Sequence, residues 1–198
     1  KSDKNWEITI EDDHLVDLIL RTNRLGVKNA DLFMYISEAG NEVDLKAEHI
    51  NQYIRASSGE GFTAKNFRTW AATHRCAERL AFLAQPQTAN DMKHWLGKLP
   101  GVESINKLWT EGDWAVPTTQ FERNKTMLAV IDTVAADLGN TRPVCRSSYI
   151  HPWFLNAWME KRLLETWNDF ASMRRISGLS AGESSTLRVL KHLRKESR

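Results

Sequence analysis

The chain has 198 residues, enough for one domain with a sizeable core or for two small ones. Its 27 Lys and Arg against 25 Asp and Glu give a formal charge of +2, which does not by itself indicate a nucleic-acid-binding protein. The apolar runs are too short to span a membrane, and no secretory signal pattern is visible. We therefore expect a cytoplasmic protein without a membrane segment.

The cysteines and histidines do not form a metal-binding pattern. Cys76 and Cys145 lie far apart in the sequence, and no CxxC motif occurs. The six histidines show neither an HExxH motif nor another paired-ligand spacing. The sequence therefore predicts no zinc site, and two unpaired cysteines fit a reducing compartment.

The first 45 residues predict a small amount of β-structure. Apolar and polar side chains alternate over residues 6–10, which predicts a strand, and residues 12–23 predict a helix. A lone strand needs a partner, and none follows directly, so we expect a hairpin partner upstream and a chain that is a fragment. A second short strand is predicted at residues 32–37, before turn residues at 39–41.

The rest of the chain predicts helices. They are expected at residues 46–57, 63–83, 90–96, 120–138, 151–174 and 180–195, with another short turn or helix around 143. Residues 86–119 are otherwise loop-like. The helix at 120–138 is predicted to bury one stripe, formed by Phe121, Leu128, Ile131, Ala135 and Leu138. The predicted fold is therefore mainly α with a small β-hairpin or strand element.

Residues 63–70, TAKNFRTW, place two basic side chains at the start of a predicted helix. Lys65 and Arg68 are three residues apart, so they share a face near the helix N-terminus, where anions are favoured. Such a face can hold a phosphate, and an arginine can donate to it in a bidentate fork. A solvated basic helix start explains the same pattern. Phe67 and Trp70 are predicted to be core residues.

Residues 138–152, LGNTRPVCRSSYIHP, contain Tyr149, one of three tyrosines. Tyr149 lies between polar residues, with Arg146 about one helical turn before it. A tyrosine hydroxyl is mostly protonated at neutral pH, and nearby cations both favour the phenolate and neutralise a phosphate that it attacks. On the residues alone, a surface or hydrogen-bonded tyrosine is a more common interpretation than a nucleophile.

Both stretches resemble motifs of the type IB DNA topoisomerases, most closely the bacterial, poxvirus-like branch. TAKNFRTW is similar to the family pattern TAK-x-FRT-[WY], and LGNTRPVCRSSYIHP is similar to LG-[HN]-T followed by SY-[IV]-HP. GLSAGES, near residue 180, is similar to the start of the family's C-terminal helix. The resemblance covers the chain except residues 86–119, which look like an insertion. It implies that residues 1–198 form a catalytic domain of the DNA breaking–rejoining fold, as a fragment that lacks the N-terminal clamp domain and the first part of the catalytic domain.

The resemblance implies a role for each matching residue. Tyr149 matches the nucleophile that forms a 3′-phosphotyrosyl link to DNA, and Arg68 matches an arginine that binds the scissile phosphate. Asn140 falls where many members have a histidine that donates to a phosphate oxygen, and an amide can also donate. Lys65 matches a DNA-backbone contact, and Arg146 is expected to contact DNA beside Tyr149.

Two other matches are less complete. The family's general-acid lysine lies in a β-hairpin, where Lys1 is the better match and Lys4 the alternative. The family's second phosphate-binding arginine lies in an R-[VI]-G-N motif, which this sequence does not contain. Residues 23–26 do not match that motif, and their position does not fit the order in which the family's motifs follow one another along the chain.

The resemblance also implies the reaction. The enzyme would nick one strand of double-stranded DNA, let the duplex swivel and reseal it, without ATP, a metal ion or another cofactor. We expect a monomer that acts at the nucleoid. A tyrosine recombinase, which shares the chemistry, and a non-catalytic helical DNA-binding module remain the two alternatives.

We predict that the 198-residue chain on its own relaxes plasmid DNA hardly at all. Each missing catalytic donor costs roughly 3 kcal/mol of transition-state stabilisation, and a small net charge gives weak binding with a shallow salt dependence. The measurement is plasmid relaxation in EDTA without ATP across a salt series. Efficient relaxation would show that the second arginine is dispensable or lies elsewhere in the chain.

Overall fold

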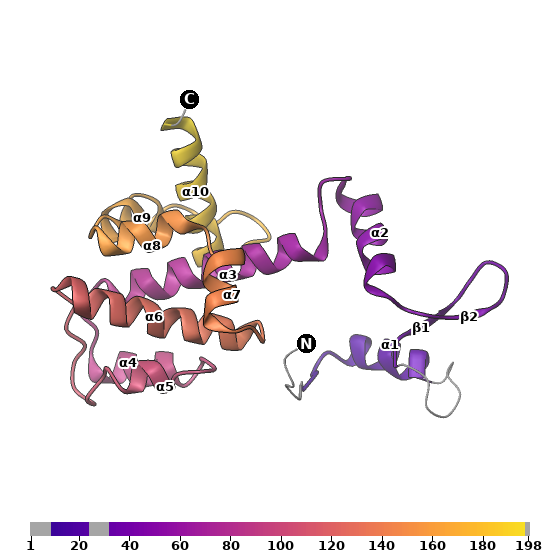
Figure 1. Cartoon of the computed structure of the whole chain (residues 1–198), viewed down its shortest axis with the longest axis horizontal. Coiled ribbons are helices and arrows are strands. Elements are labelled where there is room, and N and C mark those ends of the chain that lie inside the picture. Colours follow the sequence, from indigo (N-terminus) through magenta and orange to yellow (C-terminus); the bar gives the residue numbers. More distant parts are fainter. Residues whose placement is uncertain (1–8, 24–31, 197–198) are drawn as a thin grey trace. The chain divides into compact units, whose positions relative to one another are not determined.

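The structure, a computed structural model, describes residues 9–23 and 32–196. Within these residues the fold is mainly α-helical with one small antiparallel sheet, which confirms the predicted fold class (Figure 1). None of the described helices has the length and apolar character needed to cross a membrane. The chain divides into two compact units, Lys1–Lys65 and Asn66–Arg198, which are described separately below.

The first unit combines two helices with a hairpin. Its elements are α1 (Asp13–Asn23), β1 (Met34–Ile36), β2 (Glu42–Asp44) and α2 (Ala47–Ser58). The strands pair antiparallel with Tyr35 opposite Val43. In the turn between them, Gly40 adopts a φ of 78°, which favours glycine.

The hairpin differs from the one that the sequence predicted. The predicted strand at 6–10 forms no strand at Thr9 and Ile10, and its other residues lie outside the described part of the chain, as do Lys1 and Lys4. The predicted strand at 32–37 does form, and its partner is β2, which was not predicted. β2 is only three residues long and carries two acidic side chains, so it has no apolar alternation to indicate a strand.

The second unit is a helical domain. Its elements are α3 (Ala64–Leu83, which begins at the end of the first unit), α4 (Ala89–Leu96), α5 (Glu103–Asn106), α6 (Gln120–Asp137), α7 (Arg142–Ser148), α8 (Pro152–Met159), α9 (Leu163–Ala171) and α10 (Ala181–Glu196). α3 runs through the middle of this unit, with α6 alongside it and α4 and α5 beyond α6 (Figure 1).

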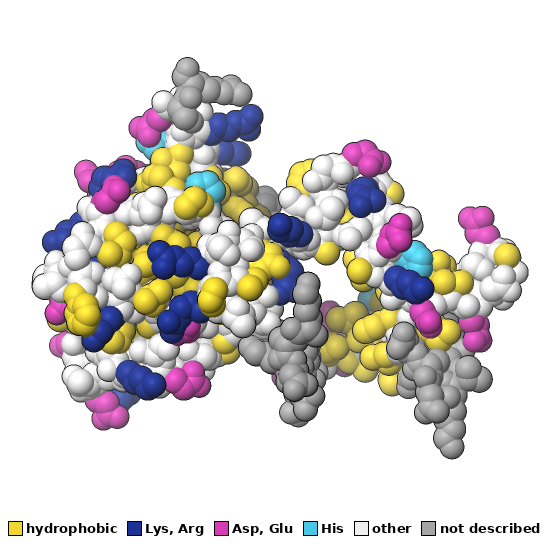
Figure 2. Space-filling view, in the orientation of Figure 1, with side chains coloured by type: hydrophobic (Ala, Val, Ile, Leu, Met, Phe, Trp, Pro, Cys, Tyr) yellow, Lys and Arg dark blue, Asp and Glu magenta, His cyan; other side chains and the backbone are white. Residues whose placement is uncertain are grey.

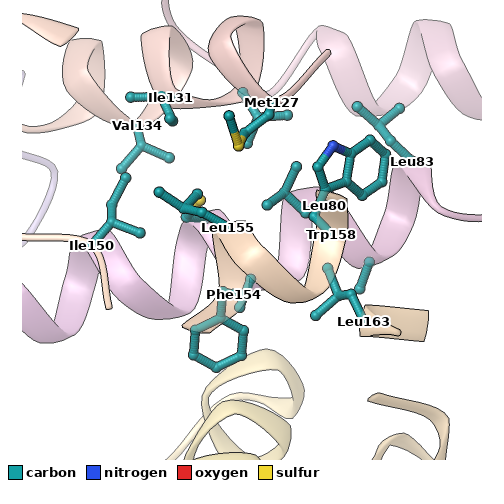
Figure 3. Close-up of a cluster of buried hydrophobic side chains, with 14 of the residues drawn as sticks. Leu80, Leu83, Met127, Ile131, Val134, Ile150, Phe154, Leu155, Trp158 and Leu163 are labelled. Atoms are coloured by element: carbon teal, nitrogen blue, oxygen red, sulfur yellow. The ribbon is translucent and has the colours of Figure 1, made fainter. Parts of the chain in front are cut away.

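The core of the second unit lies mainly between α3, α6 and α8 (Figure 3). Its largest fully buried side chains include Trp158, Phe154 and Leu80. Trp158 and Arg123 hold α8 and α6 together, because the Trp158 Nε1 donates to the Arg123 carbonyl at 2.8 Å and the Arg123 Nε donates to the Trp158 carbonyl at 3.0 Å. The buried guanidinium also stacks over the Trp158 ring at 4.6 Å from its centroid.

Residues 86–119 are more ordered than the sequence predicted. They contain α5 as well as the expected α4, and Met92, Ile105 and Trp114 are buried in the core. The Trp114 Nε1 donates to the Leu83 carbonyl at 3.0 Å, which fixes the segment to the end of α3. The prediction missed this packing because four-residue helices and isolated tryptophans leave no periodic pattern.

Two helix predictions need correction. The helix predicted at 151–174 is two helices, α8 and α9, separated by a turn in which Lys161 has a φ of 63°. Trp158 before the turn and Leu163 after it are both buried in the core. The stripe predicted on α6 is also wrong in part, since Phe121 is 67% exposed and most of the buried residues lie outside that stripe.

The contrast between the buried Phe154 and the exposed Phe121 gives a stability prediction. We expect Phe154→Ala to lower the free energy of unfolding by about 3–5 kcal/mol, because Phe154 is fully buried and leaves a cavity. Phe121→Ala should change it by no more than about 0.5 kcal/mol, because the ring is mostly in water. Urea denaturation of both variants measures the difference. Equal losses would contradict the packing described.

Candidate active site

The C-terminal end of α6 forms the centre of the candidate site. Gly139 follows the helix with a φ of 62° and donates to the Ala136 carbonyl at 3.2 Å, while the Asn140 N–H donates to the Ala135 carbonyl at 2.8 Å. This pair of bonds is a Schellman motif, in which a left-handed residue, usually glycine, ends the helix. The motif fixes the backbone of Asn140 directly beyond α6.

Arg68 reaches this helix end from α3. Its Nη2 donates to the Leu138 carbonyl at 2.8 Å and to the Asn140 Oδ1 at 3.1 Å. Arg68 thus neutralises part of the negative end of the α6 dipole and fixes the orientation of the Asn140 amide. The Asn140 Nδ2 is shielded from solvent and has no hydrogen-bond partner among the described residues. The structure therefore brings together two of the residues that the sequence singled out, 72 positions apart.

Tyr149 is the third member of the group. It ends α7 and is half-buried, and the Cζ of Arg68 lies 5.4 Å from the centre of its ring. This distance is within the range of a cation–π contact. Arg68 therefore touches both Asn140 and Tyr149, while its exposed side chain leaves room for an anion to approach.

Thr73, which the sequence analysis did not single out, holds the backbone on both sides of Ile150. Its Oγ1 donates to the Tyr149 carbonyl at 3.1 Å and accepts from the His151 N–H, also at 3.1 Å. Ile150 itself is buried in the core (Figure 3). The sequence did contain a signal for Thr73, because it lies among the apolar positions of α3. A threonine buried at such a position needs hydrogen-bond partners for its hydroxyl.

Asp137, in the last turn of α6, is bound by two arginines of α3. The Arg79 Nη2 donates to Asp137 Oδ2 at 2.5 Å, and the Arg75 Nη1 lies 3.3 Å from the same oxygen. The Arg79 Nη1 donates to Thr133 Oγ1 at 2.8 Å. Burial lowers the pKa of the Arg79 guanidinium, and Asp137 opposes that effect. This buried ion pair fixes the α6 end against α3, three residues before Asn140.

A second ion pair anchors α7. The Arg142 Nε donates to Asp132 Oδ1 at 2.5 Å, and Ser104 Oγ donates to Asp132 Oδ2 at 2.6 Å. Burial tends to raise the pKa of the Asp132 carboxyl, but the bonds from Arg142 and Ser104 outweigh burial, so the pKa lies below its ordinary value. Since α7 ends at Tyr149, this contact helps to place the tyrosine.

α10 attaches to α3 beside the site. The Trp70 Nε1 donates to Glu183 Oε1 at 3.0 Å, and Glu183 also accepts from the Ser180 N–H at 2.8 Å. The Ser180 N–H is the main cause that lowers the pKa of Glu183, followed by Trp70. Trp70 is partly buried, whereas Phe67, which was predicted to be a core residue, is 59% exposed, so that prediction is wrong.

The other predicted site residues are exposed. Lys65 lies in the first turn of α3, and Arg146 lies in the last turn of α7. Arg146 borders a hollow of about 580 Å³ that Arg142 and Asn156 also line. No hydrogen bond or ion pair joins Lys65 or Arg146 to Tyr149 in the described part of the chain. The DNA-binding roles of Lys65 and Arg146 therefore stay predictions.

Cys145, one turn before Tyr149, is the other nucleophile type in this region. It is fully buried, and burial raises the pKa of its thiol to about 11. It is therefore protonated at neutral pH and closed to substrate. In residues 9–23 and 32–196, no three His, Cys, Asp or Glu side chains are grouped closely enough to hold a metal ion.

The sequence of the chain matches a protein family. A family model described as eukaryotic DNA topoisomerase I, catalytic core, matches residues 9–161. The chain belongs to this family. The matched range includes α3, α6 and α7, which carry Arg68, the Asn140 turn and Tyr149. The predicted type IB topoisomerase family is thereby confirmed, with DNA as its substrate, whereas the bacterial branch stays a prediction. A search of curated proteins returns no match.

The two aspartate ion pairs give a matched stability prediction. Asp137→Asn should lower the free energy of unfolding by about 3–5 kcal/mol, because it leaves the buried Arg79 charge without a carboxylate. Asp132→Asn should cost about 0–1 kcal/mol, because the Arg142 side chain is 44% exposed and water can replace its partner. Chemical denaturation of both variants tests the ranking, and a larger loss for Asp132→Asn would contradict it.

Proposed function

We propose that the chain is the catalytic domain of a type IB topoisomerase that cleaves and rejoins one strand of duplex DNA through Tyr149. The observation that supports this most is the position of Arg68, which contacts both Asn140 and the Tyr149 ring from a different helix. In a member of the topoisomerase I family, this group combines a hydroxyl nucleophile with a fixed positive charge.

In the proposed cleavage step, the Tyr149 hydroxyl gives up its proton to water as its Oη attacks the phosphorus of a DNA phosphodiester. A bond forms between the tyrosine oxygen and phosphorus, and the bond from phosphorus to the 5′-oxygen breaks. The strand is left with a 3′-phosphotyrosyl link and a free 5′-hydroxyl, whose oxygen takes up a proton from a general acid. Lys1, or Lys4 in its place, stays our proposed acid, and both lie outside the described residues.

Arg68 and Asn140 are proposed to stabilise the charge that builds up on the phosphate oxygens. Donors that are fixed before the reaction are effective because they need no reorganisation in the transition state. Arg68 is fixed by the Leu138 carbonyl, and its exposed guanidinium carries further N–H donors. The Nδ2 of Asn140, whose amide is oriented by Arg68, is the donor proposed for a second oxygen.

Resealing reverses the cleavage step. The 5′-hydroxyl attacks the phosphotyrosine and releases Tyr149, so the bond energy is retained and neither ATP nor a metal ion is required. Between the two steps the duplex swivels about the intact strand, which relaxes supercoils. Lys65 and Arg146, both exposed, are proposed to contact the DNA backbone during this interval.

The finer assignment follows from the motifs. We place the enzyme in the bacterial, poxvirus-like branch, because TAKNFRTW and the Asn140 form of the LG-[HN]-T motif fit it. We propose that it acts as a monomer at the nucleoid in the cytoplasm. Residues 86–119 are proposed to be an insertion of this chain relative to that branch.

Tyr149→Phe should abolish relaxation of supercoiled plasmid by the full-length protein and leave noncovalent DNA binding nearly unchanged. Phenylalanine keeps the ring against Arg68 and removes only the oxygen. The substrate contains no recombination site, so activity of the parent protein also excludes a site-specific recombinase. Relaxation by Tyr149→Phe at a rate comparable to the parent protein would refute the assignment.

Arg68→Ala should slow single-turnover cleavage of a suicide substrate by about 10²–10³-fold, as expected for the loss of one fixed donor. Asn140→Ala should cost less, because a neutral donor is weaker than a charged one. Asn140→His should retain part of the rate, since histidine occupies this position in many members of the family. Equal losses for the two alanine variants would contradict the proposed division of roles.

A further inference from the structure

The connection between α9 and α10 holds a group of arginines that the proposed reaction does not use. Arg174 and Arg175, both exposed, line a hollow of about 450 Å³ together with Ser177. Within residues 32–196, neither guanidinium is paired with a carboxylate. The hollow therefore presents two free forks of N–H donors and a hydroxyl.

This connection is fixed to α10. The Arg188 Nη2 donates to the Arg174 carbonyl, and the Ile176 N–H donates to Ser184 Oγ at 3.0 Å. The Arg188 Nη1 is shielded from solvent and has no hydrogen-bond partner among the described residues. The unpartnered N–H donors of Arg188 Nη1 add to those of the hollow, and the two backbone contacts hold Arg174 and Arg175 in place to receive an anion.

The local charge balance supports the same conclusion. From residue 172 to residue 195 the sequence has six Lys and Arg and one acidic residue, Glu183. The Glu183 carboxylate binds Ser180 and Trp70 and forms no ion pair with Arg174 or Arg175 among the described residues. Figure 2 shows Lys and Arg side chains gathered along one side of α10, toward its C-terminal end.

The arginine group is linked to the candidate active site through α3. Glu183 binds Trp70, which lies two residues after Arg68 on the same helix. The start of α10, which holds the loop, is therefore anchored to the helix that carries Arg68 at the candidate active site, although Trp70 and Arg68, two positions apart, lie on different faces of that helix. A DNA strand bound there extends past the site on both sides, so further phosphates are available to nearby cations.

We propose that Arg174 and Arg175, with the Ser177 hydroxyl, bind a phosphate of the DNA backbone away from the scissile position. The inference rests on the proposed function for the identity of the ligand, which is duplex DNA. The contact adds affinity and fixes the position of the duplex, and it carries no sequence preference of its own because it touches only the backbone.

The test is the salt dependence of duplex binding by the chain, measured by fluorescence anisotropy in a Tyr149→Phe background so that binding stays noncovalent. The slope of log K against log[salt] becomes shallower by about 0.9 for each DNA phosphate that the protein no longer neutralises. Arg174→Ala with Arg175→Ala should therefore make the slope shallower by about 0.9, because the proposed site neutralises one phosphate. The double lysine variant, Arg174→Lys with Arg175→Lys, should retain most of the slope, because lysine also releases a counterion.

A charge-matched control is Lys93→Ala with Lys98→Ala, which removes two exposed cations at and just after α4, away from α10 (Figure 1). This control should leave the slope unchanged, and thermal melts of all variants should coincide. Equal slopes for the two double alanine variants would overturn the inference and mark the arginines as a solvated surface. Formation of a covalent DNA adduct by the protein that retains Tyr149 is measured separately. The absence of an adduct would therefore count against the proposed reaction, while the salt slopes still test the arginine site.

Discussion

The candidate site depends on one interaction, the bond from Arg68 to the end of α6. An arginine side chain has many rotamers in water, and here the Leu138 carbonyl and the Asn140 amide select one of them. Because the acceptor carbonyl belongs to the negative end of a long helix, the bond is stronger than one to an isolated carbonyl. The same bond sets the distance from the guanidinium to the Tyr149 ring. A positive charge is thereby fixed beside the tyrosine before any substrate arrives.

Other contacts keep this geometry rigid by holding three helices together. The buried pair of Arg79 and Asp137 fixes α6 against α3, and Thr73 fixes the backbone around Tyr149 to the same helix. α3 is thus the common support for Arg68, the Asn140 turn and the tyrosine. Ile150 and Phe154, on either side of His151, are both buried in the core and anchor the segment that follows Tyr149. Rigid support of this kind is what fixed donors need in order to stabilise a transition state.

The sequence was most informative where a local pattern determines structure. The helices predicted at 63–83 and 120–138 match α3 and α6, so Arg68 and the helix end that it contacts lie on predicted elements. Sequence reasoning missed Thr73 and the Arg79–Asp137 pair, because a partner 58 or 76 positions away leaves no periodic signal. It also placed Phe121 in the core, since an apolar residue at helical spacing does not reveal where a neighbouring helix ends. The break between α8 and α9 was not predicted either, because it depends on tertiary packing.

The most direct test of the central claim is to identify the residue that becomes linked to DNA. The full-length protein would be incubated with a suicide duplex whose cleaved strand cannot be resealed, digested with trypsin and examined by mass spectrometry. The account predicts that the nucleotide mass lies on the peptide 147–161, and that fragmentation assigns it to Tyr149, the one tyrosine in that peptide. A nucleotide on Tyr35, Tyr53 or any other residue, or no covalent product at all, would contradict it.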